Sequence, residues 1–320
     1  MIIAAGLSPA WQQIFVFDRF SRGEVNRAAE THACASGKVI NVGMALSFLK
    51  AEARTLSVLG GRAGALIEEE LFSQGVPARW VRDPATTRNC TTIIDRSTGE
   101  ITELVENATM IQALTCEAFL SALQEESQTA RWIVLSGSLP PIAGLASPRS
   151  LYRQMLESIT QGVSSTSPAP RVILDARGPE MLECLSCRPF LVKPNREELG
   201  ITFGNPLNDE ESMLAAMREL NRLGAEWVLV TNGSQEVWLS STTELWRFTP
   251  PSITVVNAIG CGDCLTAGLT AALDAGHDLP TAVCWGIAAA AENAMQLLPS
   301  RLNPERVRAG APRIHRQRIG

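Results

Sequence analysis

The sequence predicts an α/β fold: a doubly wound, mostly parallel sheet with helices on both faces, plus a small β-strand lid. Short apolar runs rich in β-branched residues alternate with amphipathic patterns through most of the 320 residues. This alternation is typical of parallel sheets with helical crossovers. With 45% hydrophobic and 19% charged residues, the chain can bury roughly three quarters of its unfolded surface. We therefore expect a single domain over residues 1–320.

Six apolar segments have the length of buried strands, and amphipathic segments lie between them. The predicted strands are residues 2–7, 55–59, 132–135, 172–174, 191–192 and 227–230. The predicted helices, with apolar residues at i, i+3 and i+4, are residues 65–72, 117–123, 151–159 and 210–223.

Two further regions break this rhythm and predict a small β layer. Residues 13–17, 90–94 and 101–105 have the pattern of strands, and the polar turn DRSTGE joins the last two. We expect lid strands within residues 11–36 and 86–108, over the ends of the parallel strands, where open α/β sheets bind ligands. An extension of the main sheet's edge is the alternative.

Two polar segments are expected to carry no site. Residues 161–170, QGVSSTSPAP, are small and polar enough for a surface loop. Residues 301–320 contain six arginines and a single acid, Glu305. Such a composition predicts a solvated tail.

Charge and hydropathy exclude several classes of partner. The formal net charge of −5 and the aromatic content of 5% provide neither a basic face nor a stacking surface for nucleic acid. No apolar run reaches about 18 residues, and the first residues lack the features of a signal peptide. We expect a cytoplasmic protein with no nucleic-acid or membrane partner and with free thiols. Zinc at the CxxC pairs 184–187 and 261–264 is disfavoured, because the second pair overlaps a phosphate-binding pattern.

The strongest chemical signal is NAIGCGDCLTAGLTAAL at residues 257–273. Gly260 and Gly262 flank Cys261 just before a predicted helix, so the turn's amides and the positive end of the helix dipole form an anion cradle. The same dipole and amides should favour the ionised form of Asp263. Asp263 is then either a base beside a phosphoryl group or the N-cap of an ordinary helix.

A second signal, VKPNREELG at residues 192–200, follows a short predicted strand. Lys193 can neutralise phosphate, and Asn195 and Glu198 lie three residues apart on an incipient helical turn. Their amide and carboxylate oxygens suit a magnesium ion carried by a nucleotide, reached through water. The alternative is a capping box, in which the two side chains cap the helix.

Three loop motifs add to these signals. In ASGKVIN, residues 35–41, a glycine turn precedes a helix, and Lys38 and Asn41 either contact a substrate or mark an ordinary junction. SGSLPP and VTNGS, at residues 136–141 and 230–234, follow predicted strands and are weaker signals. Among 28 basic residues, lysine occurs only at positions 38, 50 and 193. This scarcity favours Lys38 and Lys193 as site residues, because an ammonium on a flexible stem differs chemically from a guanidinium.

Other catalytic patterns are missing from the sequence. It has no GxxxxGK[ST] P-loop, and no GxGxxG follows a predicted strand. The three histidines, His32, His277 and His315, share no metal-ligand or nucleophile spacing.

Taken in order, SGSLPP, LVKPNREEL and IGCGD, with ASGKVIN and RGEVNRA in support, resemble motifs of the ribokinase-like (PfkB) sugar kinases. Within that family the chain is most similar to the branch of 1-phosphofructokinases and tagatose-6-phosphate kinases. The resemblance covers nearly the whole chain. It implies a ribokinase-like fold, ATP and Mg²⁺ as co-substrate and cofactor, and a homodimer formed through the β lid.

The resemblance also implies roles for residues that match the family's motifs. Asp263 matches the catalytic base, and Gly260, Cys261 and Gly262 match the anion hole. Asn195 and Glu198 match the magnesium-associated pair. The implied ATP contacts are Lys193, Asn195, Thr231, Gly233 and Asn293, and the implied sugar-phosphate contacts are Gln12, Gly37, Lys38, Asn41, Arg88, Glu106 and Ser138.

The sequence departs from the family pattern at four of these motif positions. Gln12 stands where the family has an aspartate, so an uncharged amide replaces the carboxylate that would receive sugar hydroxyls. Val39 replaces the second glycine of GKG, Glu236 a glycine of the nucleotide loop, and Cys261 an alanine. The change at Gln12 leaves the identity of the sugar open.

The resemblance implies ATP-dependent phosphorylation of a phosphorylated ketohexose, with fructose 1-phosphate converted to fructose 1,6-bisphosphate as the first expectation. A tagatose-6-phosphate kinase or 6-phosphofructokinase is the close alternative, and a nucleoside or unphosphorylated sugar the distant one. A catalytically silent sugar-phosphate sensor is the alternative from another class. The retention of Asp263, Asn195, Glu198 and both cradle glycines argues against that sensor.

Overall fold

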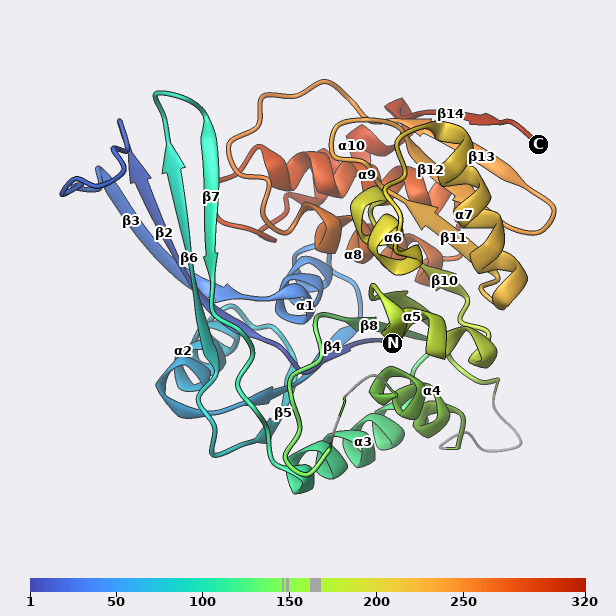
Figure 1. The fold of residues 1–320 in the computed structure, drawn as a ribbon, viewed down its shortest axis with the longest axis horizontal. Helices are drawn as coiled ribbons and strands as arrows, with labels where there is room; N and C mark the ends of the chain where they lie inside the picture. Colours follow the sequence, from blue (N-terminus) through green and yellow to red (C-terminus); the bar gives the residue numbers. More distant parts are fainter. Residues whose placement is uncertain (146, 148–149, 162–167) are drawn as a thin grey trace.

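The computed structural model describes residues 1–145, 147, 150–161 and 168–320, and its centre is a ten-stranded sheet (Figure 1). In spatial order the strands are β14 (His315–Arg318), β13 (Leu245–Thr249), β12 (Val237–Ser240), β11 (Trp227–Val230), β10 (Leu191–Val192), β9 (Arg171–Asp175), β8 (Trp132–Ser136), β1 (Ile2–Gly6), β4 (Ala53–Leu59) and β5 (Ala78–Arg82). The strands from β11 to β5 are parallel, and β12, β13 and β14 continue the sheet antiparallel. The predicted parallel sheet is confirmed.

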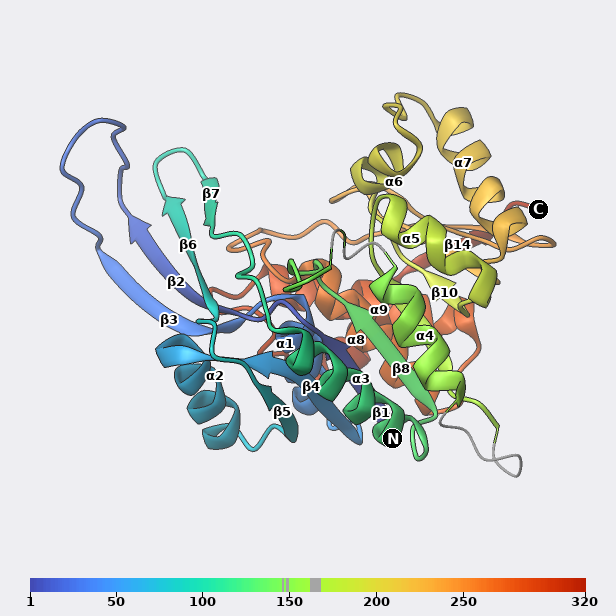
Figure 2. The same ribbon diagram turned by 60° about the horizontal axis from the view of Figure 1, so that its bottom comes forward.

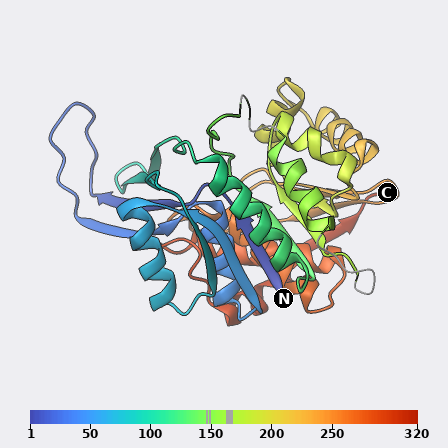
Figure 3. The same ribbon diagram turned by 90° about the horizontal axis from the view of Figure 1, so that it is seen from below.

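Helices cover both faces of this sheet, as Figures 2 and 3 show. One face carries α1 (Lys38–Phe48), α2 (Gly61–Ser73), α8 (Cys261–Asp274), α9 (Leu279–Ala294) and α10 (Pro304–Gly310); the other carries α3 (Ala113–Ser127), α4 (Leu151–Gln161), α5 (Pro179–Cys184), α6 (Arg196–Phe203) and α7 (Glu210–Leu223). Because strand side chains alternate, Ile2 and Ala4 join one core while Ile3 and Ala5 join the other. None of the helices in the described ranges has the length and apolar character needed to cross a membrane.

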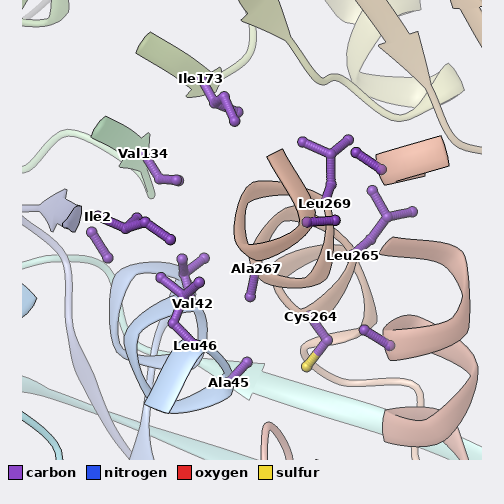
Figure 4. Close-up of a cluster of buried hydrophobic side chains, with 14 of the residues drawn as sticks. Ile2, Val42, Ala45, Leu46, Val134, Ile173, Cys264, Leu265, Ala267 and Leu269 are labelled. Carbon is purple, nitrogen blue, oxygen red and sulfur yellow. The ribbon is translucent and has the colours of Figure 1, made fainter. Parts of the chain in front are cut away.

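Close packing of α1 against α8 brings the starts of both helices to one edge of the sheet. Figure 4 shows Val42 and Ala45 of α1 near Ala267 of α8, in the core that also contains Ile2 and Val134 of the strands. Small side chains at this contact allow the helix axes to approach closely. Both N-terminal turns therefore lie where β1 and β8 end.

A separate four-stranded sheet forms the lid, in the order β3 (Glu30–Ser36), β2 (Ala10–Phe17), β6 (Arg88–Asp95) and β7 (Glu100–Val105). The predicted second β layer is confirmed, and β3 lies within the expected lid range 11–36, although only residues 13–17 of that range had the pattern of a strand. One lid face buries Ile14 and Ile94, which pack against Leu297 and Leu298. The alternative of an extended main-sheet edge is wrong.

The C-terminal segment differs from the sequence prediction. Residues 301–320 are not a solvated tail, because α10 and β14 pack onto the body and Val307 and Ile314 join the main core. β14 pairs with β13, where Arg318 lies opposite Trp246. The sequence pattern missed this strand because all four of its residues, HRQR, are polar and exposed, so it has no alternation of apolar and polar residues. Of the predicted loop 161–170, residues 162–167 lie outside the described residues.

Gly6 provides a test of the packing at this edge. A Cβ at Gly6 would lie 2.1 Å from the Ser136 backbone oxygen, so we predict that Gly6→Ala lowers the free energy of unfolding by about 3 kcal/mol or more. Gly75→Ala is the control: its Cβ would meet nothing within 4 Å, and only its left-handed φ opposes it, at about 1–2 kcal/mol. Urea unfolding measures both losses, and equal losses would contradict the close approach at Gly6.

Candidate active site

A cleft of about 1100 Å³ lies between the lid and the carboxyl ends of the parallel strands. Ligands bind at this position in open α/β sheets. The lid, the N-terminal turns of α1 and α8, the ends of β9, β10 and β11, and one face of α9 all contribute to its walls. Most of the predicted site residues line it: Gln12, Gly37, Lys38, Asn41, Arg88, Lys193, Asn195, Glu198, Thr231, Gly233, Gly260, Cys261, Gly262 and Asp263.

Asp263 lies in the first turn of α8 and is 6% exposed. Asn41 of α1 donates its side-chain amide to Asp263 Oδ2 at 2.7 Å, and Ser36 Oγ donates to Asn41 Oδ1 at 3.3 Å. The α1–α8 contact thus fixes the direction of the carboxylate. Asp263 is not the N-cap of α8, because Gly260 occupies that position and no side chain caps the helix.

The expectation that the helix would favour ionised Asp263 is wrong in direction. The pKa of Asp263 is raised to about 6: burial is the largest cause and the nearby Asp175 carboxylate adds to it, while Lys38, Asn41 and Lys193 act in the opposite direction. Desolvation penalises the charged form more strongly than one helix terminus stabilises it. The pKa of Asp263 therefore lies close to neutral pH, where a general base is most effective.

The glycine turn before α8 presents free amides to the cleft. Gly260 adopts a left-handed φ of 76°, which glycine tolerates without strain. The Cys261 amide donates to the Ala258 oxygen at 3.3 Å. Within the described ranges, no protein acceptor engages the amides of Gly260, Gly262 and Asp263. These three N–H groups can receive an anion at the helix N-terminus.

Asp175, at the end of β9, is a site residue that the sequence analysis missed. Its buried carboxylate lies between two lysines, 3.0 Å from Lys38 Nζ and 3.3 Å from Lys193 Nζ. Burial opposes ionisation, but the two ammonium groups outweigh it and lower the pKa of Asp175 overall. The signal available in the sequence was an acid directly after the apolar strand VIL.

Lys38 also contacts Glu198, at 3.4 Å. Burial lowers the pKa of Lys38, yet the carboxylates of Asp175 and Glu198 outweigh burial and raise it. Lys38 therefore stays charged. Its ammonium faces the acids beneath the cleft, together with Lys193.

Asn195 and Glu198 form a capping box at the start of α6. Asn195 Oδ1 accepts the Glu198 amide at 2.7 Å, and Glu198 Oε2 accepts the Asn195 amide at 3.0 Å. The structure therefore contains the capping box that the sequence analysis gave as the alternative to a magnesium-binding pair. Of the side-chain oxygens of these two residues, Glu198 Oε1 remains outside the box and faces Lys38.

A largely apolar wall closes the cleft on the α9 side. It is lined by Val237, Pro250, Pro251, Val255, Ile287, Ala290, Ala291 and Ala294. Thr231 and Gly233 lie on the same side, at the end of β11. A planar apolar group such as a nucleotide base fits this wall, with its phosphates toward the glycine turn.

Asn293 does not line the cleft, contrary to the expected adenine contact. Its side-chain amide donates to the Ile259 oxygen at 2.8 Å and to Cys261 Sγ at 3.3 Å. Its oxygen accepts the Ser300 amide at 2.7 Å. Asn293 is 1% exposed, and its side chain holds the glycine turn in place from behind.

Two expected sugar contacts also fall outside the cleft lining. The Glu106 carboxylate accepts the Asn89 amide at 2.7 Å, because Glu106 continues β7 on the face opposite to Val105, which lines the cleft. Ser138, in the turn after β8, donates to the Ser8 hydroxyl at 3.1 Å. Arg88 does line the cleft; its guanidinium donates to the backbone oxygens of Glu106 and Ser8 at 3.2 and 3.3 Å.

The sequence profile described as the pfkB family of carbohydrate kinases matches residues 11–305. The chain belongs to this family. A tagatose-6-phosphate kinase from Staphylococcus epidermidis is 29% identical over 276 residues, or 85% of each chain. This pfkB carbohydrate kinase also has solved structural neighbours, which share its fold.

Escherichia coli phosphofructokinase-2 in complex with potassium superposes with a TM-score of 0.86 at 21% identity, covering 98% of this chain and 99% of that one. A Thermotoga maritima protein titled "possible 1-phosphofructokinase" gives a TM-score of 0.86 at 18% identity, with both chains fully covered. The ribokinase-like fold expected from the sequence is confirmed.

The environment of Asp263 predicts an unusual titration. We expect one aspartate carboxyl to titrate near pH 6, and to be protonated below and ionised above that pH, because burial disfavours the charge. NMR titration of protein labelled with ¹³C in the aspartate carboxyls measures this pKa. The resonance should vanish in Asp263→Asn, and an Asp263 signal that titrates near the ordinary value of about 4 would contradict the prediction.

The position of Asn293 predicts a kinetic effect without a nucleotide contact. Asn293→Ala leaves the Ile259 oxygen and the Ser300 amide unpaired, so the glycine turn loses its support and kcat should fall about tenfold or more. The KM for ATP should stay within about twofold. Steady-state kinetics on the folded variant measures both. A raised ATP KM with unchanged kcat would instead restore the adenine contact.

Proposed function

We propose that this kinase transfers the terminal phosphoryl group of ATP to a phosphorylated ketohexose, with fructose 1-phosphate converted to fructose 1,6-bisphosphate as the leading reaction. Tagatose 6-phosphate and fructose 6-phosphate are the alternative acceptors. One observation carries the proposal: Asp263 faces the cleft beside three free amides, between a polar lid and an apolar wall.

In the proposed reaction Asp263 removes the proton of the acceptor hydroxyl. Asn41 holds the carboxylate through Oδ2, which leaves Oδ1 for the substrate. A base whose pKa is about 6 is mostly ionised at neutral pH and still accepts a proton readily. Such a positioned base contributes roughly 10² to 10⁴ in rate.

Charge stabilisation comes from the turn and the lysines. The amides of Gly260, Gly262 and Asp263 are placed to receive the oxygens of the phosphoryl group in flight. Lys38 and Lys193, which now neutralise Asp175, are close enough to the cleft to neutralise the ATP phosphates. In-line phosphoryl transfer requires little more than such positioning and charge.

The residues present fit a magnesium ion better at Asp175 than at Asn195. The two oxygens of the buried Asp175 carboxylate pair with Lys38 and Lys193 among the described residues, and Glu198 Oε1 lies outside the capping box, 3.4 Å from Lys38 Nζ. The side-chain oxygen of Asn195 already caps α6. Asp175 and Glu198 would hold the ion, which neutralises phosphate charge when bound. No group of three candidate metal-ligating side chains occurs in the described ranges, so phosphates and water must complete the coordination.

The phosphorylated acceptor is supported by the lid side of the cleft. Arg88 lines it, and a guanidinium suits a phosphate dianion. Gln12, Gly37 and Asn41 line the same cleft as Arg88 and Asp263. The named Staphylococcus epidermidis relative supports a ketohexose phosphate.

We also propose that two copies associate through their lids. β7 is an edge strand of the small sheet and exposes Leu104 and Val105, each 55% accessible. An exposed edge with apolar side chains favours pairing with a second strand.

The experiment that tests the function is a coupled ADP-release assay with ATP, Mg²⁺ and a panel of free and phosphorylated ketohexoses. Release with fructose 1-phosphate supports the leading reaction, and release with tagatose 6-phosphate or fructose 6-phosphate selects an alternative. Release with none, together with measurable sugar-phosphate binding, would favour the silent sensor and contradict the proposal.

Within that assay, Asp263→Asn should lower kcat by roughly 10² or more. Nucleotide affinity, measured by calorimetry, should stay nearly unchanged because the amide is isosteric and Asp263 contacts the acceptor, not the base or ribose. Near-normal turnover in this variant would remove Asp263 from its proposed role.

A further inference from the structure

The lid contributes one carboxylate to the cleft, that of Glu103 on β7. Strand pairing places it: Gln12 lies opposite Cys90, Thr92 opposite Glu103, and Cys90 opposite Val105. Since side chains alternate along each strand, these residues share the lid's inner face. All but Thr92 line the cleft directly, so the register of the lid sheet decides that Glu103 points inward.

Glu103 differs from the other acids of the cleft in having no partner. Asp263 is held by Asn41, Asp175 by two lysines, and Glu198 by the capping box and Lys38. In the described part of the chain, no hydrogen bond or ion pair engages the Glu103 carboxylate. Burial raises the pKa of Glu103, and the positive charge of Arg88 opposes this rise. Although partly covered, Glu103 is an exposed residue at the cleft wall, so its carboxylate is hydrated and available to accept hydrogen bonds from a ligand.

Gln12, on the same lid face as Glu103 but two strands away across β6, is held in one orientation. Its Nε2 donates to Thr92 Oγ1 at 2.6 Å and to the Gln13 oxygen at 3.3 Å. No group in the described ranges donates to its Oε1, which is left as an acceptor on the cleft side. The inner lid face therefore presents two acceptors, Gln12 Oε1 and Glu103, on the side of the cleft that also carries Arg88.

We propose that Glu103 is a specificity-determining residue, whose carboxylate accepts hydrogen bonds from hydroxyl groups of the acceptor sugar while Gln12 accepts a further one. This inference rests on the proposed function and refines its substrate class: a polyhydroxylated phosphate, with the phosphate toward Arg88 and free hydroxyls toward Glu103. The charges of Arg88 and Glu103 disfavour binding of the sugar phosphate in the reverse orientation, because its phosphate would then lie beside the negative charge of Glu103.

The test compares Glu103→Gln and Glu103→Ala with Glu100→Gln, a control on the same strand but on its outer face. Each enzyme is assayed with fructose 1-phosphate, tagatose 6-phosphate, fructose 6-phosphate and free fructose. For the best phosphorylated substrate of the wild type, the KM of Glu103→Ala should rise roughly tenfold or more, since a charged acceptor is lost. Glu103→Gln should rise less, because its amide keeps one acceptor.

Two readouts separate recognition from a structural role. The KM for ATP should stay within about twofold in every variant. The ratio of kcat/KM between fructose and tagatose phosphates should decrease for Glu103→Ala only, because the variant no longer hydrogen-bonds the hydroxyl whose configuration differs. Glu100→Gln should match the wild type, and thermal unfolding confirms that the variants are folded.

The outcomes are distinguishable from failure of the proposed function. If the wild type phosphorylates a sugar phosphate and Glu103→Ala keeps both its sugar KM and its discrimination, the role of Glu103 is overturned and the function stands. If Glu103→Ala changes only the oligomeric state, the carboxylate belongs to an interface and the inference is wrong. If the wild type phosphorylates no sugar phosphate, the proposed function itself fails, and the role of Glu103 fails with it.

Discussion

The hydrogen bond from Asn41 to Asp263 joins the first turns of two helices that are 222 residues apart in sequence. It requires α1 and α8 to pack closely and in register, which small side chains along α8 permit. The glycine turn at residues 260–262 precedes α8 and β3 of the lid precedes α1, so this contact fixes the positions of both. The glycine turn, Asp263 and the lid side of the cleft are thus connected through a single helix–helix contact.

Charge balance is the second constraint. Asp175, Glu198 and Asp263 lie near one another with only Lys38 and Lys193 as compensating cations. Burial raises the pKa of Asp263 most, the neighbouring Asp175 carboxylate adds to the rise, and the two lysines oppose it. The structure thus links the basicity of the proposed catalytic residue to the same lysines that would meet the nucleotide phosphates.

The inner face of the lid has an apolar part that packs on the body and a polar part that lines the cleft. Toward the tip, Ile14 and Ile94 rest on Leu297 and Leu298 and fix the lid to the body. Toward the root, Gln12 and Arg88 of the same face line the cleft, and Glu103, level with Ile14 across β6, lines it as well. Because both halves lie on the same strands, the apolar contact sets the height at which the polar groups meet a substrate.

By itself, the sequence determined the parallel sheet, most of its helices, the glycine turn before Asp263 and the lysine and NxxE segment, because periodicity and turn chemistry are local signals. Only the tertiary structure decided which groups face one another. Asp175 pairs with two lysines that come from other elements. Strand alternation directs Glu103, and not the expected Glu106, into the cleft. Asn293 supports the glycine turn from behind and does not line the cleft. The pKa of Asp263 also belongs to this second class, since burial and neighbouring charges depend on contacts between distant segments.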